Sequence, residues 1–146
     1  MKKGITIVSL TIYIVLFFSL TILATFVTTN FNKNLLQEKG NIIINEETIK
    51  LQSNLLNSGK NSISITKQNN IINFSNGDVY TFDQEKKNIL KNNGVLVSNV
   101  INFKVIDSSV MTNNSLEEYK SLAVYVEFKK YDIVKKFNIF VGAGDE

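Results

Sequence analysis

One uncharged stretch near the start of the chain constrains the fold more than any other feature. After Lys2 and Lys3, no charged residue occurs until Lys33. The apolar part of this stretch, Ile5–Val27, would span roughly 34 Å as an α-helix. That length slightly exceeds the hydrocarbon core of a bilayer, where a helix satisfies its own backbone polar groups. The sequence therefore predicts a single-pass membrane protein, with the two lysines holding the N-terminus in the cytoplasm and the C-terminal domain outside.

The ends of this stretch differ from those of an ordinary signal peptide. Such a peptide has an apolar region of about 7–15 residues and a small-x-small cleavage site. The run in this chain is longer, and Leu23-Ala24-Thr25 fits such a site poorly. At the other end, the basic segment Lys2-Lys3-Gly4 meets the apolar segment Ile5–Leu10 directly, with threonine second and leucine sixth after the glycine.

This junction resembles the class III signal of type IV pilins and pseudopilins. The family has a short basic leader, a glycine before the cut, an apolar first mature residue, threonine second and leucine sixth. The resemblance implies that residues 1–4 are a prepilin leader, that a prepilin peptidase cleaves between Gly4 and Ile5, and that Ile5 is N-methylated. The alternative is a plain membrane anchor, because hydropathy alone does not separate the two.

The sequence departs from the family at Ser9. The family usually has glutamate there, as the fifth mature residue, and its carboxylate is thought to pair with the free amine of a neighbouring subunit. Serine cannot carry that charge. Minor pilins and tip pseudopilins are the members known to dispense with the glutamate, so the resemblance implies a minor subunit.

Helical periodicity continues beyond the membrane half, 5–27, into residues 28–58. A line of apolar residues recurs at every seventh position, flanked by further apolar residues: Leu35, Ile42, Ile49 and Leu56, with Leu36, Ile43, Leu51 and Leu55. This pattern predicts an amphipathic helix packed on the chain's own sheet and, in a filament, on other subunits. A coiled coil is less favoured because the d-type positions are polar, at Glu38, Asn45 and Gln52.

Two glycines modify this helix. Gly40-Asn41 introduces weak helix formers, so a bend or a loosened turn would be unsurprising there. Gly59 supplies a left-handed C′ residue, so the helix is predicted to end near Ser58 and the β domain to occupy 59–146.

Beyond residue 59, apolar residues alternate with polar ones, which predicts short antiparallel strands. Asn76-Gly77 predicts a hairpin turn. A three-residue loop through Asp78 is favoured over a two-residue loop because it pairs apolar side chains: Phe74 with Tyr80, and Ile72 with Phe82. Asn92-Asn93-Gly94 predicts a second turn, and the change of phase near Ser98-Asn99 predicts a bulge or break.

The C-terminal third is predicted as a loop followed by a hairpin. Ser108–Tyr119 is polar and is predicted to be a surface loop anchored by Met111 and Leu116. Two alternating runs joined by a turn at Lys129–Asp132 predict the hairpin, with buried faces made of Leu122, Val124, Val126 and Phe128 and of Phe137, Ile139 and Val141. Ala143–Glu146 is expected to fray.

The composition argues against catalysis. The chain has no cysteine or histidine, and its 16 basic residues are all lysine, so disulfides, thiol nucleophiles and histidine ligands are excluded. The paired acids Glu46-Glu47 and Glu117-Glu118 diverge on a helix or strand. Asp78, Asp83 and Glu85 lack the spacing of a calcium loop. The sequence therefore predicts a non-enzymatic protein with no cofactor and no metal.

Charge gives little support for nucleic-acid binding. The net charge of +3 includes Lys2 and Lys3, so the processed chain would carry about +1. A cluster around the last turn contains Lys129, Lys130, Lys135 and Lys136 beside Tyr131. A solvated, lysine-guarded strand edge is favoured over DNA contact there. Hydroxyl residues of the apolar helix either pack helices together or bond their own helix: Thr6, Ser9, Thr11, Ser19, Thr21 and Thr25.

The sequence thus predicts an α+β protein with a long N-terminal transmembrane and amphipathic helix packed on a small antiparallel sheet. This order resembles pilins, and its spacing is similar to minor pseudopilins of the J type and their competence relatives. The resemblance implies a minor subunit of a type IV pilus, competence pseudopilus or secretion pseudopilus, at or near the tip. Its implied partners are other pilins, the prepilin peptidase, an inner-membrane platform and an assembly ATPase. The alternative is a membrane-anchored module that binds a ligand or partner and does not polymerise.

Overall fold

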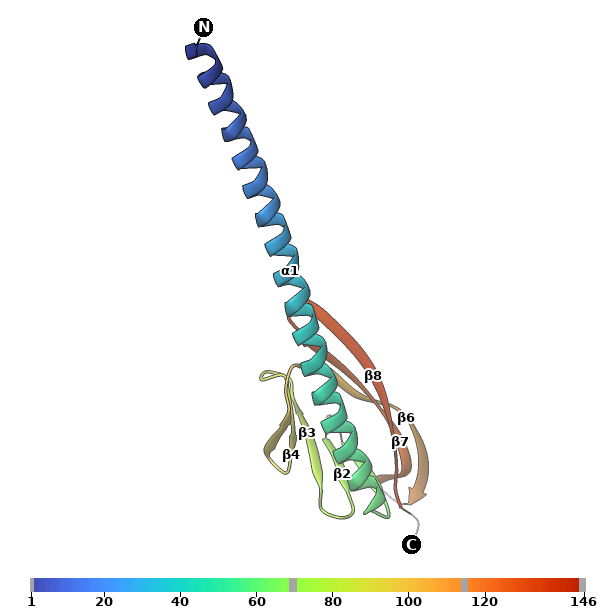
Figure 1. The fold of residues 1–146 in the computed structure, drawn as a ribbon. Coiled ribbons are helices and arrows are strands. Elements are labelled where there is room, and N and C mark those ends of the chain that lie inside the picture. Colours follow the sequence, from blue (N-terminus) through green and yellow to red (C-terminus); the bar gives the residue numbers. More distant parts are fainter. Residues whose placement is uncertain (1, 69–70, 114–115, 145–146) are drawn as a thin grey trace. The chain divides into compact units, whose positions relative to one another are not determined.

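The computed structural model describes residues 2–68, 71–113 and 116–144, and within them all side chains except those of residues 2–5 and 106–119. One helix and eight strands occur within these ranges (Figure 1): α1 (Lys2–Lys60), β1 (Ile65–Gln68), β2 (Ile71–Phe74), β3 (Val79–Asp83), β4 (Asn88–Lys91), β5 (Gly94–Val97), β6 (Val100–Asn113), β7 (Leu116–Lys130) and β8 (Ile133–Gly142). The predicted α+β class is confirmed. The chain divides into two units, Met1–Glu38 and Lys39–Glu146.

In the first unit, the described side chains of α1 are all exposed. The large apolar residues between Ile7 and Phe31 leave 47–71% of their surface uncovered. By length and composition, α1 is a helix that could cross a membrane, and its most apolar part lies in this unit. So much uncovered apolar surface is unusual for a protein in water and fits a lipid environment.

The second unit contains an antiparallel sheet in the order β5-β4-β3-β2-β1-β7-β6, with β8 also paired to β7. The long strand β7 pairs with β6 along one side. Along its other side, β7 pairs first with β1, at Glu118 and Tyr119, and then with β8 from Ser121 onward. One strand therefore joins the N-terminal meander to the C-terminal hairpin.

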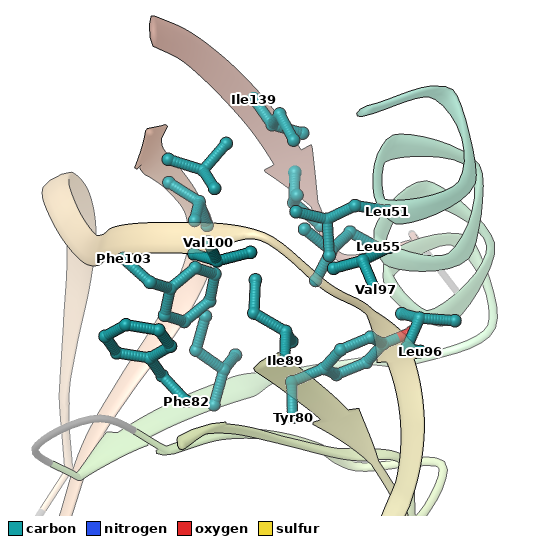
Figure 2. Close-up of a cluster of buried hydrophobic side chains, with 14 of the residues drawn as sticks. Leu51, Leu55, Tyr80, Phe82, Ile89, Leu96, Val97, Val100, Phe103 and Ile139 are labelled. Carbon is teal, nitrogen blue, oxygen red and sulfur yellow. The ribbon is translucent and has the colours of Figure 1, made fainter. Parts of the chain in front are cut away.

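The last part of α1 supplies one wall of the core of this unit. Ile44, Leu51 and Leu55 of the helix are fully buried, and Figure 2 shows Leu51 and Leu55 directed toward Val97 and Ile139. Burying each leucine or isoleucine contributes about 1.5–3 kcal/mol. The helix and the sheet are thus parts of one hydrophobic core.

The buried side of the helix agrees with the prediction only in part. Leu51 and Leu55, predicted as flanking residues, are buried, but the seven-residue line is exposed: Leu35 (38%), Ile42 (51%), Ile49 (65%) and Leu56 (42%). The buried side carries small residues between its large ones, at Gly40, Thr48, Ser58 and Gly59. Small residues let a helix backbone come close to the sheet, so they select this side over the more continuous apolar line.

α1 runs through Gly40-Asn41 without interruption and ends at Lys60, two residues beyond Ser58. One prediction about its end is wrong. Gly59 is not among the residues with positive φ, so it is not a left-handed cap. A Cβ on Gly59 would lie 2.4 Å from the Gly142 carbonyl oxygen, and one on Gly40 would lie 2.9 Å from Ile133 Cδ1. Both glycines therefore serve close packing.

The hairpin register between β2 and β3 also differs from the prediction. Ile72 lies opposite Tyr80 instead of Phe82. The loop occupies residues 75–77, where Gly77 adopts a φ of 92°, and the Phe74 amide donates to the Asp78 carbonyl at 2.9 Å. The error of two residues left the predicted faces intact, and Phe74 and Tyr80 remain in edge-to-face contact.

The other turns agree with the predictions made from the sequence. Asn92 and Asn93, with φ values of 50° and 68°, form the two-residue turn between β4 and β5. The predicted break at Ser98-Asn99 separates β5 from β6. In the final hairpin the predicted buried faces are confirmed, except that Phe137 is half-buried.

Two predictions near the C-terminus are wrong. Most of Ser108–Tyr119 belongs to the paired strands β6 and β7 and is not a loop. The side chains of Met111 and Leu116, the predicted anchors, lie outside the described part of the chain. Ala143 and Gly144 are tied down: the Ala143 amide donates to the Lys120 carbonyl, and the Gly144 amide donates to two carbonyls near the end of α1. Residues 145 and 146 lie outside the described ranges.

Candidate functional site

The residues of the predicted processing site lie in the first turns of α1. Gly4 and Ile5 are helical, and the Ile5 side chain belongs to the part that is not described. Ser9 is exposed and lies one turn after Ile5. Positions 5 and 9 share one side of the helix, so a residue at position 9 lies near whatever approaches position 5.

The hydroxyl residues of the apolar helix bond to their own backbone. Thr11, Ser19, Thr21 and Thr25 each donate to the carbonyl four residues earlier, at 2.8–3.0 Å. Thr28 and Thr29 do the same at 2.8 Å. Of the two interpretations of these residues, the structure favours self-bonding. A helix whose hydroxyls are satisfied internally can enter hydrocarbon without leaving these groups unpaired.

A polar cluster in the second unit ties the end of α1 to β3 and β4. The fully buried Ser58 hydroxyl donates to Asp78 Oδ2 at 2.5 Å and lies 2.7 Å from the Tyr80 hydroxyl. Lys91 Nζ lies 2.9 Å from Asp78 Oδ2 and 3.4 Å from Ser58 Oγ. Asn92 Nδ2 donates to Asp78 Oδ1 at 3.2 Å. No sequence pattern predicts this cluster, because the spacing marks Ser58 only as the residue near the end of the helix.

The serine, lysine and aspartate of this cluster have the residue types of a nucleophile and its base. Burial acts to raise the pKa of the Asp78 carboxyl, but hydrogen bonds from Ser58, Lys91 and Asn92 outweigh it and lower that pKa to about 2. Burial acts to lower the pKa of Lys91, but its hydrogen bond to Asp78 outweighs this and raises it. Lys91 therefore keeps its proton and cannot act as a base toward Ser58. The cluster fixes the end of the helix.

Within the described residues, no three acidic side chains converge as metal ligands would. Asp78 is bonded as described above. Asp83 accepts a hydrogen bond from the Lys86 amide at 2.9 Å. Glu47 accepts one from the Ser98 amide at 3.3 Å, whereas Glu46 is exposed. Asp83 therefore stabilises a turn, and Glu47 holds the connection between β5 and β6.

The lysine cluster predicted around the last turn is divided by the structure. Lys135 donates to Asn45 Oδ1 at 3.1 Å, and Lys136 pairs with Glu127 at 3.3 Å. Lys129 and Lys130 instead line a pocket of about 490 Å³ together with two lysines from the β3–β4 turn, Lys86 and Lys87. We call this the lysine pocket. Its two pairs lie far apart in the sequence, so no local pattern could predict it.

No family model, curated protein or solved structure matches this chain. The fold defines a class, an α+β protein with an antiparallel sheet and one long N-terminal helix that is apolar enough to span a membrane. Any more specific function has to be argued from the residues and their geometry.

Proposed function

We propose that this chain is a minor subunit of a type IV pilin-like filament and that its role is structural. The observation that carries the proposal is the continuity of α1, which begins at Lys2 as an uncovered apolar helix and ends at Lys60 as one wall of a β domain's core. Such a helix can serve in two environments, first in lipid and later among other apolar helices. The junction between Gly4 and Ile5 supplies the matching processing site.

A second apolar surface on α1 supports assembly with other subunits. Ile42, Ile49 and Leu56 leave 42–65% of their surface uncovered although the opposite part of the helix is buried. The packing on the sheet does not require these residues. We assign them to contact with the N-terminal helices of neighbouring pilin-family subunits, where burial would recover their hydrophobic free energy.

Ser9 makes this subunit a minor one in the proposal. A carboxylate at position 9 would attract a neighbour's N-terminal amine more strongly in a dry filament interior than in water. Serine lacks this attraction, so the chain is not expected to build the repeating shaft by itself. It would occupy the tip or its vicinity, with the N-terminus cytoplasmic before extraction by the platform and assembly ATPase. The filament would be a type IV pilus, a competence pseudopilus or a secretion pseudopilus.

Processing provides the first test. Intact-mass analysis of protein purified from membranes with an active prepilin peptidase should show a chain that begins at methylated Ile5. Gly4→Val should leave residues 1–4 attached, because a branched side chain does not fit where the family requires glycine. Ser9→Ala is the matched control, since it alters the same helix beyond the cut and should be processed normally. Retention of Met1 in the unmodified protein would overturn the proposal and favour the non-polymerising anchored module.

Abundance provides the second test. Quantitative mass spectrometry of sheared filaments should find this chain far below the major subunit. Ser9→Glu should leave membrane insertion intact and either raise incorporation along the shaft or block an initiating role. A wild-type chain as abundant as the major subunit would contradict the minor assignment.

A further inference from the structure

The lysine pocket is built by three chain segments that backbone hydrogen bonds join together. The Val100 amide donates to the Lys87 carbonyl at 2.9 Å, which joins the β3–β4 turn to the start of β6. The Lys129 amide donates to the Asn99 carbonyl at 2.8 Å, which joins the same connection to the end of β7. Backbone hydrogen bonds therefore hold the frame of the pocket in place.

Each of these segments holds one residue in the left-handed conformation. The φ values are 56° at Lys87, 62° at Asn99 and 52° at Tyr131, and all three residues line the pocket. Among the described non-glycine residues with positive φ, the remaining two, Asn92 and Asn93, form an ordinary hairpin turn. Asparagine adopts this conformation readily, whereas lysine and tyrosine seldom do. Lys87 ends the loop before β4, and Tyr131 begins the two-residue turn between β7 and β8. Their positive φ values therefore belong to the two turns that bring the lysines of both hairpins to the pocket.

The pocket is strongly positive. Four of its lining residues are lysines, and none of the described lining residues is acidic. Lys86 lies 4.0 Å from Asp83, and Lys130 donates to Asn99 Oδ1 at 3.2 Å. Within the described part of the chain, the ammonium groups of Lys87 and Lys129 have no hydrogen-bond or ion-pair partner. Two cations are thus left to face an incoming anion.

We propose that the lysine pocket binds the phosphate groups of a phosphodiester polymer. Lysines on flexible stems act as point charges that several phosphate oxygens can meet at once. A volume of about 490 Å³ is within the range of ligand sites and exceeds the needs of a single phosphate. The exposed Tyr131 and the half-buried Ile101 add an apolar wall for the carbon part of the ligand. This inference does not depend on whether the chain enters a filament.

The test uses full-length protein in detergent micelles and two fluorescently labelled probes, a short oligothymidylate and a glycerol-phosphate polymer, with fluorescence anisotropy as the measurement. We expect at least one probe to bind, inorganic phosphate to compete, and Lys87→Gln/Lys129→Gln to weaken binding at least tenfold. Each lost phosphate contact lowers the salt dependence, so the slope of log K against log salt should become shallower by about 1.4 for the oligothymidylate. The probe that binds more tightly identifies the source of the phosphodiester.

The control is Lys50→Gln/Lys67→Gln, which removes the same charge from exposed positions outside the pocket lining. It should change binding less than twofold, and unfolding temperatures should show that both double variants remain folded. If the pocket variant unfolds, Lys129→Gln alone should still weaken binding about threefold. Equal losses in the pocket and control variants, or no binding of either probe, would overturn the inference.

Discussion

The two sides of α1 between Lys39 and Lys60 offer a comparison within one helix. One side carries Ile44, Leu51 and Leu55, which are fully buried against the sheet. The other carries Ile42, Ile49 and Leu56, which are equally apolar but largely exposed. Residue hydrophobicity therefore does not decide which side the β domain covers.

The difference lies in the residues between the apolar ones. On the buried side, Gly40 and Gly59 lie so close to the β7–β8 hairpin and its end that an added Cβ would collide with neighbouring atoms. Ser58 on the same side is bonded to Asp78 and Tyr80. The close approach of the helix to the β7–β8 hairpin and the hydrogen bonds of Ser58 determine which side is buried. The β domain leaves the side with Ile42, Ile49 and Leu56 uncovered.

The largest expected effect on stability comes from placing one negative charge on each side of the helix in turn. Leu51→Asp should unfold the β domain, because an unpaired buried carboxylate costs several kcal/mol, comparable with the stability of a small domain. Ile49→Asp places the same charge on the exposed side and should change the unfolding temperature little. Circular dichroism of the full-length protein during heating measures both. Equal destabilisation by the two variants would show that the buried side has been assigned wrongly.

The next effect tests the close approach. Gly59→Val should destabilise the domain by about 3 kcal/mol, because its Cβ would lie 2.4 Å from a backbone oxygen that belongs to Gly142. Gly142→Val is the matched control, since a Cβ there meets nothing within 4 Å. Chemical denaturation of the two variants gives the free energies of unfolding. The packing argument fails if the two glycines tolerate valine equally well.

A smaller effect comes from the polar cluster at the end of the helix. The pKa of Asp78 is lowered from 3.8 to about 2 in the folded protein. Its ionised form therefore stabilises the fold by about 2 kcal/mol above pH 4, and this contribution is lost as the pH falls toward 2. Asp78→Asn should be less stable at pH 7 and should lose less stability over the acid range. Unfolding free energies measured between pH 2 and pH 7 test this, and parallel curves for variant and parent would count against it.

The smallest expected effect on stability is also the sharpest test of the proposed contacts. Ile42→Ser/Ile49→Ser should change the free energy of unfolding by only about 0.5 kcal/mol, because both side chains are already exposed. Incorporation into filaments should fall, since these residues are assigned to contact with other helices. Gln52→Ser is the control on the exposed surface and should incorporate normally. A double variant that assembles as well as the parent would remove this surface from the proposed function.

The sequence predicted the features that depend on local patterns. The length of the uncharged stretch predicted the apolar helix, and the paired asparagines predicted the β4–β5 turn. The alternation of apolar and polar residues predicted the buried face that includes Val126. Prediction from the sequence failed where contacts between distant segments determine the structure. The buried side of α1 depends on Gly142 and Ile133, and the strands within 108–119 depend on pairing between two polar runs. The lysine pocket joins Lys87 to Lys129, and no periodic pattern links them.

The bonds around the end of α1 bear on how the domain carries mechanical load. The Gly144 amide donates to the carbonyls of Gly59 and Ser62, at 3.0 and 2.8 Å, so the segment after β8 is fastened to the end of the helix. Ser58 fastens the same turn to β3 through Asp78 and Tyr80. Tension along the helix would thus be divided between both halves of the sheet, and several bonds would have to break together before the helix could be peeled away.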